Sequence, residues 1–263
     1  MLLTVKGLVL RETPYGEADK LIDLLTDEGV ITVRARGARK PGSKYAALTQ
    51  LFSYAEFCLR QSHDRFFLDS AVPIQLFYGI RNDLEALALA AYFSELTRKI
   101  ATAQPQPQIL RLFLYCLHYL SVHSRPLPQI KSIFELRMLT ELGMMPDLLC
   151  CSACGEYLPQ QLVLRIANGD FRCSECHPNN QTTDLSVTVG VLQAARHIVF
   201  SDFDRLFHYR LQDRSQQLLS LFTEQYACYR LELRCKTLRF YHSLTDGCTT
   251  MPLSQPDFGT DYE

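Results

Sequence analysis

The 263-residue chain contains no Trp, so its 15 Phe and 13 Tyr residues must supply all of the aromatic packing. No apolar run approaches the ~18 residues that a membrane-spanning helix needs, so no membrane partner is expected. Net charge is also nearly absent, because 27 basic and 28 acidic residues leave a formal charge of -1. Affinity for a polyanion must therefore come from a local cluster of charges.

Other absences concern targeting and catalysis. The start "MLLTVKGLVLRE" is interrupted by Lys6 and Gly7 and has no small-residue cleavage site, so we expect no secretory signal and a cytoplasmic location. No His is followed two places later by Glu, and H-E-x-x-H does not occur, which argues against zinc deaminases and proteases. We find no Ser/His/Asp or paired-carboxylate arrangement. No catalytic residue and no small-molecule substrate are therefore predicted.

A partial match to a phosphate-binding loop occurs at "GARKPGSK" (37–44). The order of Ser43 and Lys44 is inverted relative to G-x-x-x-x-G-K-[ST], and Pro41 removes an N–H that a phosphate cradle would use. No long helix plainly begins there. We therefore do not expect nucleotide hydrolysis.

Residues 1 to about 80 have the pattern of short strands. "VITVRARG" places Ile31, Val33 and Ala35 on one face and polar residues on the other, which is the two-residue period of a half-buried strand. "LLTVKGLVLRE", "YAEFCLRQ" and "RFFLDSAVP" are further candidate strands, whereas "TPYGEADKLIDLLTDEG" predicts a turn and a short amphipathic helix. Several short strands in so few residues favour a small barrel.

The pattern changes to helical spacing after residue 80. "RNDLEALALAAYFSELTRKI" predicts a helix capped by Asn82 or Asp83, and two more are expected at about 109–122 and 128–142, the last ending at Gly143. "SVTVGVLQAARHIVF" predicts a helix with a Ser cap, and 213–244 are periodic throughout. The segment 245–263 has four acids and no bases, so we expect an acidic, disordered tail.

Four cysteines interrupt the helical region in two pairs, Cys151-x2-Cys154 and Cys173-x2-Cys176. A two-residue gap lets both thiolates of a pair face one ion, and the intervening hairpin with its "NGD" turn has the layout of a zinc ribbon. Four thiolates would close the coordination shell, so the predicted Zn²⁺ is structural. A redox dithiol and an unmetallated cluster are the alternatives.

The remaining thiols have simpler interpretations. Cys150 and His177 flank the pairs and could each replace a ligand, although this would break the symmetric spacing. The isolated cysteines are interpreted as small core residues or tail thiols; they are Cys58, Cys116, Cys228, Cys235 and Cys248.

A basic stretch is the second informative segment, since 29–55 contains no acidic residue. Cations that track a backbone, interleaved with aromatic rings, are typical of single-stranded nucleic-acid binding. The aromatic candidates are Tyr45, Phe52 and Tyr54, and the alternative is a solvated loop whose aromatics belong to a core. The predicted nucleic-acid-binding residues are Arg34, Arg36, Arg39, Lys40 and Lys44, with Lys6, Arg11 and Lys20 as weaker candidates.

These motifs together resemble one family. "PYGEADKL", "RGARKPGSK" and the "L--F" before the next strand, with the later "CSACG…CSEC", are similar to bacterial RecO, a family of DNA repair and recombination mediators, in its zinc-containing type. The resemblance implies an α+β fold: an N-terminal OB-fold β-barrel (1–80) followed by an all-α domain (81–145 and 181–244). A four-cysteine, zinc-ribbon-like knuckle (146–180) is inserted in that domain, and 245–263 form the tail.

The resemblance also implies a function. A RecO protein would be a non-enzymatic mediator in the bacterial cytoplasm, associated with the nucleoid. It would bind single- and double-stranded DNA, anneal complementary strands, and with RecR help RecA replace the single-strand-binding protein SSB, whose acidic C-terminal tail it would bind. The alternatives are a zinc-dependent nuclease, which needs a carboxylate cluster or an open metal site, and a protein-interaction scaffold without direct DNA binding.

Overall fold

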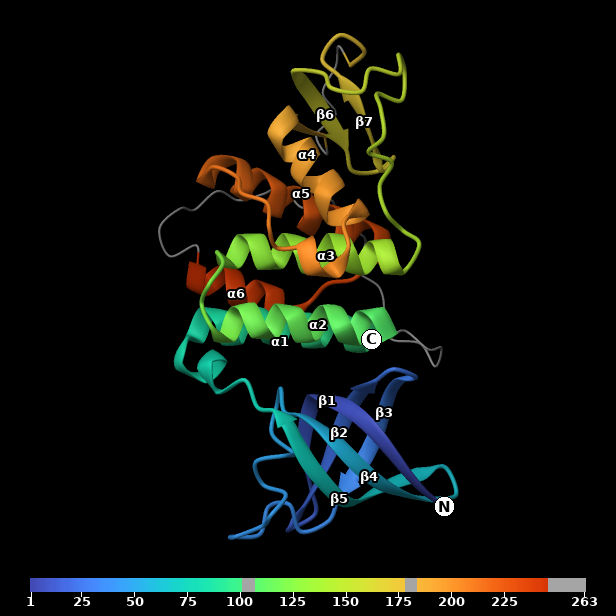
Figure 1. Ribbon diagram of the computed structural model, residues 1–263, viewed down its shortest axis with the longest axis vertical. Helices are drawn as coiled ribbons and strands as arrows, with labels where there is room; N and C mark the ends of the chain where they lie inside the picture. The colour runs from blue at the N-terminus through green and yellow to red at the C-terminus, as the bar shows by residue number, and fades with distance from the viewer. Residues whose placement is uncertain (101–106, 178–183, 246–263) are drawn as a thin grey trace, which may run out of the picture.

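A barrel, a helical layer and a small knuckle follow one another along the long axis of the molecule in the computed structural model (Figure 1). The structure describes residues 1–100, 107–177 and 184–245. The strands are β1 Leu2–Tyr15, β2 Asp19–Thr26, β3 Gly29–Ala35, β4 Tyr54–Ser62, β5 Arg65–Gln75, β6 Gln161–Arg165, β7 Asp170–Cys173 and β8 Asp184–Thr188. The helices are η1 Tyr78–Asn82, α1 Leu84–Ile100, α2 Pro107–Ser121, α3 Leu127–Glu141, α4 Val189–Phe200, η2 Phe203–Arg205, α5 Asp213–Leu231 and α6 Lys236–Thr245.

Five strands form a closed barrel in the order β1-β2-β3-β5-β4, which confirms the predicted OB-like domain. All neighbours are antiparallel except β3 and β5, which pair in parallel through Val33 and Phe66. Val33 and Ala35 point into the barrel core with Phe57 and Leu59, as their two-residue period predicts. The turn at residues 63–64 joins β4 to β5 where the sequence indicated it.

The helix predicted within 13–29 is wrong, because these residues form the end of β1, a turn and β2. Ile22 and Leu24 point into the barrel, whereas Leu25, from the other face of the strand, belongs to the core shared with the helices. A strand that is apolar on both faces loses the alternation that would identify it. The apolar residues three and four positions apart then have the spacing that is typical of an amphipathic helix.

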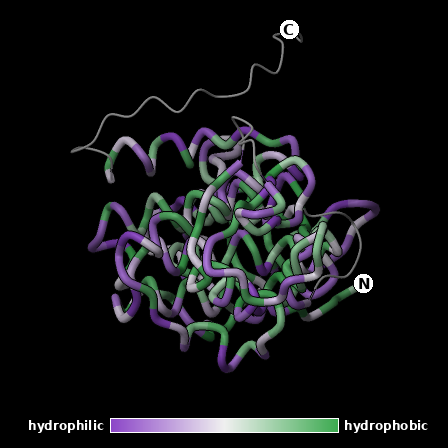
Figure 2. Tube along the Cα trace, turned by 90° about the horizontal axis from the view of Figure 1, so that it is seen from above, coloured by the Kyte–Doolittle hydropathy of each residue, from purple (hydrophilic) through white to green (hydrophobic). Residues whose placement is uncertain are grey.

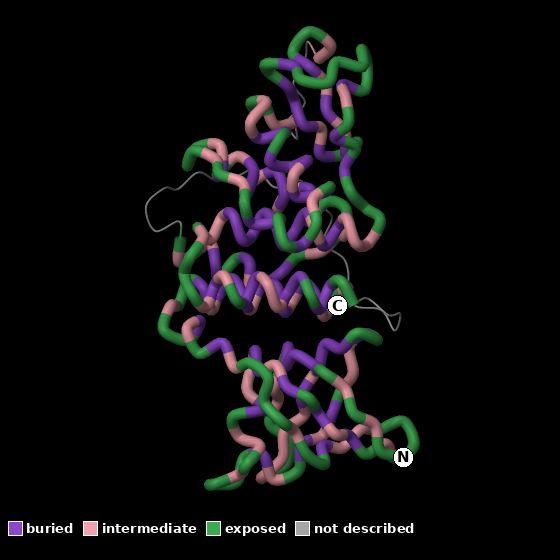
Figure 3. The backbone as a smooth tube through the Cα atoms, viewed as in Figure 1, coloured by how far each residue is buried: buried purple, intermediate pink, exposed green. Residues whose placement is uncertain are grey.

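The barrel and the helical domain share one core. Leu8, Leu10, Leu25 and Phe52 pack with the buried side chains of the helices, and Figure 3 shows buried residues continuing from this boundary through the helical layer. Arg98 of α1 reinforces the boundary by donating from Nε to Asp23 of β2 over 3.1 Å. Seen end-on, the loops that project from the sides are mostly hydrophilic (Figure 2).

Helix ends are defined partly by local and partly by distant residues. Asp83 caps α1 as predicted, because its Oδ1 accepts the backbone N–H groups of Glu85 and Ala86. The predicted Ser cap in 186–200 is wrong, since Ser186 lies in β8 and α4 begins after Thr188. The predicted stop of α3 at Gly143 is confirmed by the positive φ of 73° there.

The periodic segment 213–244 is two helices, because the chain turns at Glu232 with a φ of 52°. The Glu95 carboxylate of α1 accepts the backbone N–H groups of Lys236 and Thr237 and so caps α6 from outside. Burial alone would raise the pKa of Glu95, but the hydrogen bonds from Thr237, Lys99 and Lys236 lower that pKa to about 2.

A buried charge network joins α3 to α5. Lys131 is 1 % exposed, and its Nζ lies 3.1 Å from a Glu135 carboxylate oxygen and 2.7 Å from Oε2 of Glu224. Glu135 also accepts hydrogen bonds from Tyr92 at 2.9 Å and Thr223 at 2.7 Å. Burial would lower the pKa of Lys131, but the two carboxylates raise it. The lysine is therefore a charged core residue held by two acids.

The knuckle contains a three-stranded antiparallel sheet in the order β7-β6-β8. The predicted hairpin is present as β6 and β7, with Gly169 at a φ of 73° before β7. β8 pairs with β6 through Leu162 and Val187, so the sheet extends beyond the predicted boundary at residue 180. The segment 178–183 and the predicted tail, apart from Thr245, lie outside the described residues.

Candidate nucleic-acid interface and metal centre

The basic loop connects β3 to β4 as a series of turns from Arg36 to Ser53. No helix begins within it, which agrees with the rejection of a phosphate-binding loop. Its base is fixed to the β1–β2 turn, since the Gly37 N–H donates to Oδ1 of Asp19 over 2.8 Å and the Arg39 N–H to the Ala18 carbonyl over 2.9 Å. Buried Ala38, Leu48 and Phe52 anchor the loop from inside, so its cations remain at the surface.

Six of the eight predicted cationic residues are exposed. They are Lys6, Arg11, Arg36, Arg39, Lys40 and Lys44. Within the part of the chain that the structure describes, no carboxylate lies within ion-pair distance of any of these six. Arg39 donates from Nη1 to the Gly16 carbonyl over 3.1 Å, and the Lys44 ammonium lies 4.9 Å from the centre of the Tyr45 ring. The loop therefore presents cations that form no ion pair with any described acid.

The other two predicted cations are paired. Arg34 is half-buried, and its Nη2 lies 2.7 Å from Oδ2 of Asp19. Lys20 pairs with Glu12 of the neighbouring strand. Asp19 has a lowered pKa, chiefly because it accepts the Gly37 N–H and the Arg34 guanidinium, with a further contribution from the charge of Arg36. Both ion pairs remove positive charge from the predicted interface. They form because neighbouring strands bring the partners together, which the local sequence does not show.

The three interleaved aromatic residues have different environments. Phe52 is 3 % exposed and lies 6.4 Å, centre to centre, from Phe113 of α2, so it is a core residue and not a stacking platform. Tyr45 is half-buried, and its hydroxyl donates to the Asp69 carbonyl over 2.5 Å. Tyr54 is half-buried at the start of β4. The exposed loop is thus richer in charge than in free aromatic rings.

Sequence reasoning missed Arg60, an exposed cation on β4. Its guanidinium lies 5.7 Å from the centre of the Phe67 ring, and that of Arg36 lies 4.7 Å from the same ring. The alternation of "YAEFCLRQ" places Arg60 on the solvent face of its strand. The pairing of β4 with β5, which brings Arg60 opposite Phe67, is not visible in the sequence.

The four predicted cysteine ligands meet at one point. The Sγ atoms of Cys151, Cys154, Cys173 and Cys176 all lie within 4.8 Å of one another. Sγ of Cys173 lies 3.8 Å from that of Cys151 and 3.7 Å from that of Cys154. A zinc–sulfur bond of ~2.3 Å places the sulfurs of a tetrahedron about 3.8 Å apart, so the donor set fits Zn²⁺.

Local backbone geometry produces the cluster. Gly155, with a φ of 78°, turns the chain after the first pair, and its N–H donates to the Cys151 carbonyl over 2.9 Å. The Cys176 N–H donates to the Cys173 carbonyl over 3.1 Å. Each pair therefore forms a tight turn that directs both sulfurs to the same side, as the two-residue spacing predicts.

The thiol environments also favour a bound cation. Burial alone would raise the pKa of Cys151, but the N–H groups of Cys173, Cys154 and Ala153 lower it to about 6. Hydrogen bonds with the thiols of Cys173 and Cys154 raise the pKa of Cys176 to about 12. Four thiols this close cannot all ionise without a positive charge between them, and a divalent metal supplies that charge.

Neither flanking residue joins the cluster. Cys150 is half-buried and lies outside the group of converging ligand atoms. Nε2 of His177 lies 2.9 Å from Oδ2 of Asp184, at the start of β8, and both side chains are largely buried. His177 therefore connects the end of the knuckle to the sheet.

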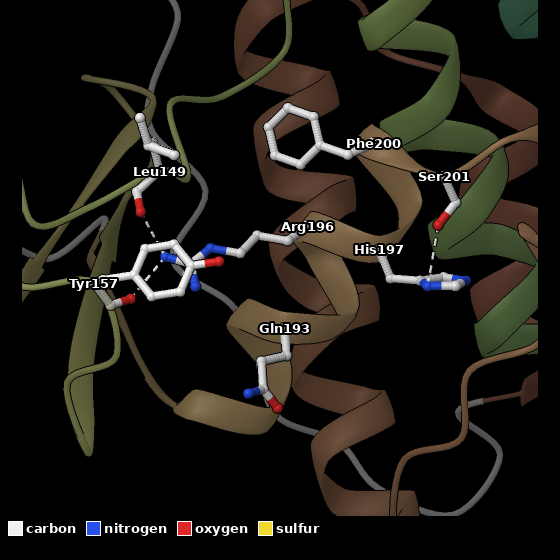
Figure 4. Close-up of a pocket in the computed structure, with 7 residues that line it drawn as sticks. All are labelled: Leu149, Tyr157, Gln193, Arg196, His197, Phe200 and Ser201. Carbon is white, nitrogen blue, oxygen red and sulfur yellow. Dashed lines mark hydrogen bonds between the residues drawn. The ribbon is translucent and has the colours of Figure 1, made fainter.

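A pocket of about 440 Å³ lies where α4 meets the knuckle, and both apolar and polar side chains line it (Figure 4). Leu149, Tyr157 and Phe200 surround Arg196, whose Nη2 donates to the Leu149 and Tyr157 carbonyls over 2.7 and 2.8 Å. The Tyr157 ring lies 4.1 Å from the same guanidinium. Nε of Arg196 also donates to the Leu148 carbonyl over 2.7 Å, so three of its N–H groups hold the knuckle against α4.

Among the described residues, the cysteine cluster is the one group of three or more His, Cys, Asp or Glu side chains that could hold a metal. No helix in the described ranges has both the length and the apolar character needed to cross a membrane. Figure 1 places the knuckle and the barrel at opposite ends of the molecule, so the metal centre and the cationic loop are separate sites.

Comparisons with known proteins cover both domains. The family model described as "Recombination protein O N terminal" matches residues 1–77, and "Recombination protein O C terminal" matches residues 81–239. The chain is 33% identical over 244 residues to the DNA repair protein RecO of Acetivibrio thermocellus, covering 92% of this chain and 97% of that protein. For the RecO proteins of Bacillus pumilus and Bacillus subtilis the identities are 31% over 246 residues and 30% over 233 residues. These cover 93% and 86% of this chain, and 95% and 90% of the respective relatives.

Proposed function

The chain belongs to the recombination protein O (RecO) family, and from this premise we propose that it is a DNA-binding mediator of recombination and repair. In this proposal it anneals complementary strands and, together with RecR, helps RecA replace SSB on single-stranded DNA. It does so without covalent chemistry. It works in the bacterial cytoplasm, at the nucleoid.

The open cationic loop on the barrel is the observation that carries this proposal. Arg36, Arg39, Lys40 and Lys44 are exposed and have no carboxylate partner among the described residues, although the chain as a whole is nearly neutral. A local excess of guanidinium and ammonium groups binds phosphates and releases their counterions. Because base edges are not needed for such contacts, binding is expected to be independent of sequence and to include duplexes as well as single strands.

Annealing follows from charge neutralisation. Two complementary strands repel each other through their phosphates, and base pairing supplies the favourable free energy once they meet. Cations on a folded surface screen the repulsion and hold one strand while the other arrives. The required contribution is therefore electrostatic, and a site with no general acid or base can provide it.

The metal has a structural role in this proposal. Cys151, Cys154, Cys173 and Cys176 would hold Zn²⁺, and four thiolates leave no open coordination position for a substrate or an activated water. The ion would join the turn after α3 to the end of β7. Stability of the knuckle, not catalysis, is the expected contribution.

RecR and the acidic, apolar C-terminal tail of SSB are the expected partners, with RecA affected indirectly. The SSB tail is proposed to bind the helical domain, and no pocket residues are assigned to it. The family membership supports a place among recombination proteins, and the barrel supports the DNA contact.

The test is an annealing assay on complementary strands coated with SSB, with and without RecR. We expect faster annealing with the protein, a further increase with RecR, and slower annealing with the charge-reversed variant Arg36→Glu/Arg39→Glu. Cleavage of labelled DNA in the presence of Mg²⁺ would favour the nuclease alternative instead. Absence of both annealing and salt-sensitive DNA binding would favour the scaffold alternative.

A further inference from the structure

One aromatic ring on the outer face of the barrel is shared by two exposed arginines. β5 lies between β3 and β4, so a side chain on its solvent face has neighbours from both. Phe67 of β5 is the cross-strand partner of Arg60 on β4 and of Arg34 on β3. Arg36, two residues beyond Arg34, lies 4.7 Å from the ring centre, and Arg60 lies 5.7 Å from it.

The ring restricts both guanidinium groups. A cation over an aromatic face is attracted by the ring quadrupole, and Arg can stack its planar group there while its N–H donors stay in water. Phe67 is half-buried, so its own position is fixed by the strand. With Arg36 and Arg60 close to it, the ring is not free for a nucleobase. The surface offers two oriented guanidinium groups instead.

Neither guanidinium group of this pair forms an ion pair with a described acid, although the charge of Arg36 also acts on Asp19. Among the described residues no carboxylate lies within ion-pair distance of Arg36 or Arg60, in contrast to Arg34, which is bound to Asp19. Because both guanidinium groups lie near the centre of one ring, they are at most about 10 Å apart. This is within about one Debye length at 0.1 M salt, so their mutual repulsion is only partly screened. An anion bound close to both groups relieves this repulsion.

We propose that Arg36, Phe67 and Arg60 form a phosphate-binding subsite on the outer face of β3, β5 and β4. Both arginines contact the DNA backbone, and Phe67 is a positioning residue that holds them and stacks on no base. The inference rests on the proposed DNA-binding function and extends it from the 36–44 loop to the wall of the barrel. The subsite takes single strands and duplexes alike, because it contacts only phosphates.

The test measures the affinity of the full-length protein for an oligothymidine and for a duplex of equal length, over a range of KCl concentrations. Arg60→Gln is expected to weaken binding to both probes several-fold. The slope of log K against log salt should fall in magnitude by ~0.7 for the single strand and ~0.9 for the duplex, as loss of one phosphate contact requires. Arg239→Gln is the matched control, since it removes one exposed arginine from α6.

Variants at Phe67 separate positioning from stacking. Phe67→Leu should weaken both probes about two- to fivefold with unchanged slopes, since the arginines keep their charge but lose their support, and Phe67→Tyr should restore wild-type affinity. A loss confined to the single strand would make the ring a base platform and overturn the inference. Equal behaviour of Arg60→Gln and Arg239→Gln would also overturn it.

The outcomes distinguish this inference from the proposed function. If wild-type protein binds neither probe in a salt-dependent manner, the DNA-binding function itself is wrong. If wild type binds and Arg60→Gln changes nothing, only the subsite is wrong. Should Phe67→Leu fail to fold, Arg60→Lys takes its place, because lysine keeps the charge and loses the planar stacking. Arg60→Lys should then weaken binding with unchanged salt slopes, whereas Arg60→Gln should lower the slopes.

Discussion

Replacing Lys131 by methionine tests the physics of the helical core most sharply. The side chain of Lys131 is 1 % exposed and that of Glu135 is fully buried, so the substitution leaves one carboxylate in the core without its cation. Glu224, whose side chain is 18 % exposed, loses the same partner and keeps His242 at 2.9 Å. Removing one member of a buried ion pair costs about 3–5 kcal/mol of unfolding free energy.

The cost should depend on pH. In the Lys131→Met protein the pKa of Glu135, already raised by burial in the native protein, rises further because the opposing charge is gone. A group whose folded pKa is raised contributes stability below its unfolded pKa, near 4.5, and loses that contribution as pH increases through the folded pKa. The variant should therefore be closer to wild type at pH 5 than at pH 7.5.

Urea unfolding followed by far-UV circular dichroism measures this effect on the helices. The control Lys236→Met removes an exposed lysine and should stay within about 0.5 kcal/mol of wild type. The double variant Lys131→Met/Glu135→Gln should recover part of the loss, because glutamine carries no charge. Its carbonyl oxygen can accept from one of the hydroxyls of Tyr92 and Thr223, and its amide N–H can donate to the other. If Lys131→Met lowers the unfolding free energy by less than about 1 kcal/mol, equally at both pH values, the buried ion pairs of Lys131 with Glu135 and Glu224 do not stabilise the core in this way.

Two further predictions concern the knuckle and α6. Cys151→Ser or Cys173→Ser, like removal of the metal by a chelator, should reduce stability and soluble yield far more than DNA affinity; a well-folded, metal-free variant would contradict the structural role. Glu95→Gln should lower the unfolding free energy by about 1–3 kcal/mol, because charged hydrogen bonds to the start of α6 are lost. Since the folded pKa of Glu95 is about 2, the wild-type advantage should be full above pH 4.5 and fade as pH falls toward 2, as acid titrations of both proteins would reveal.

Local patterns predicted much of the molecule. β3 was identifiable because buried Val33 and Ala35 alternate with polar Thr32 and Arg34, and the Asp83 cap lies next to the helix it begins. The cysteine cluster was predictable for the same reason, since two short turns set the direction of the sulfurs. The convergence of the two cysteine pairs depends on the fold of the knuckle. The predicted hairpin between the pairs indicated that they would converge.

What could not be predicted depends on distant contacts. β2 is apolar on both faces because the helical domain covers the side that a lone barrel would expose. The break between α5 and α6 has no Gly or Pro to mark it, and the Glu95 carboxylate that caps α6 comes from α1, far along the chain. Likewise Arg34 looked as free as Arg36, but the antiparallel pairing of β2 with β3 brings Asp19 to Arg34.

The decisive measurement is the salt dependence of single-stranded DNA affinity, compared between wild type and Arg36→Glu/Arg39→Glu. We predict a steep decline of wild-type affinity with salt, and a variant that binds weakly to every sequence. Its slope should be smaller in magnitude by ~0.7 for each lost phosphate contact. Equal affinity and equal slope for the two proteins would contradict the claim that cations on the barrel neutralise DNA phosphates.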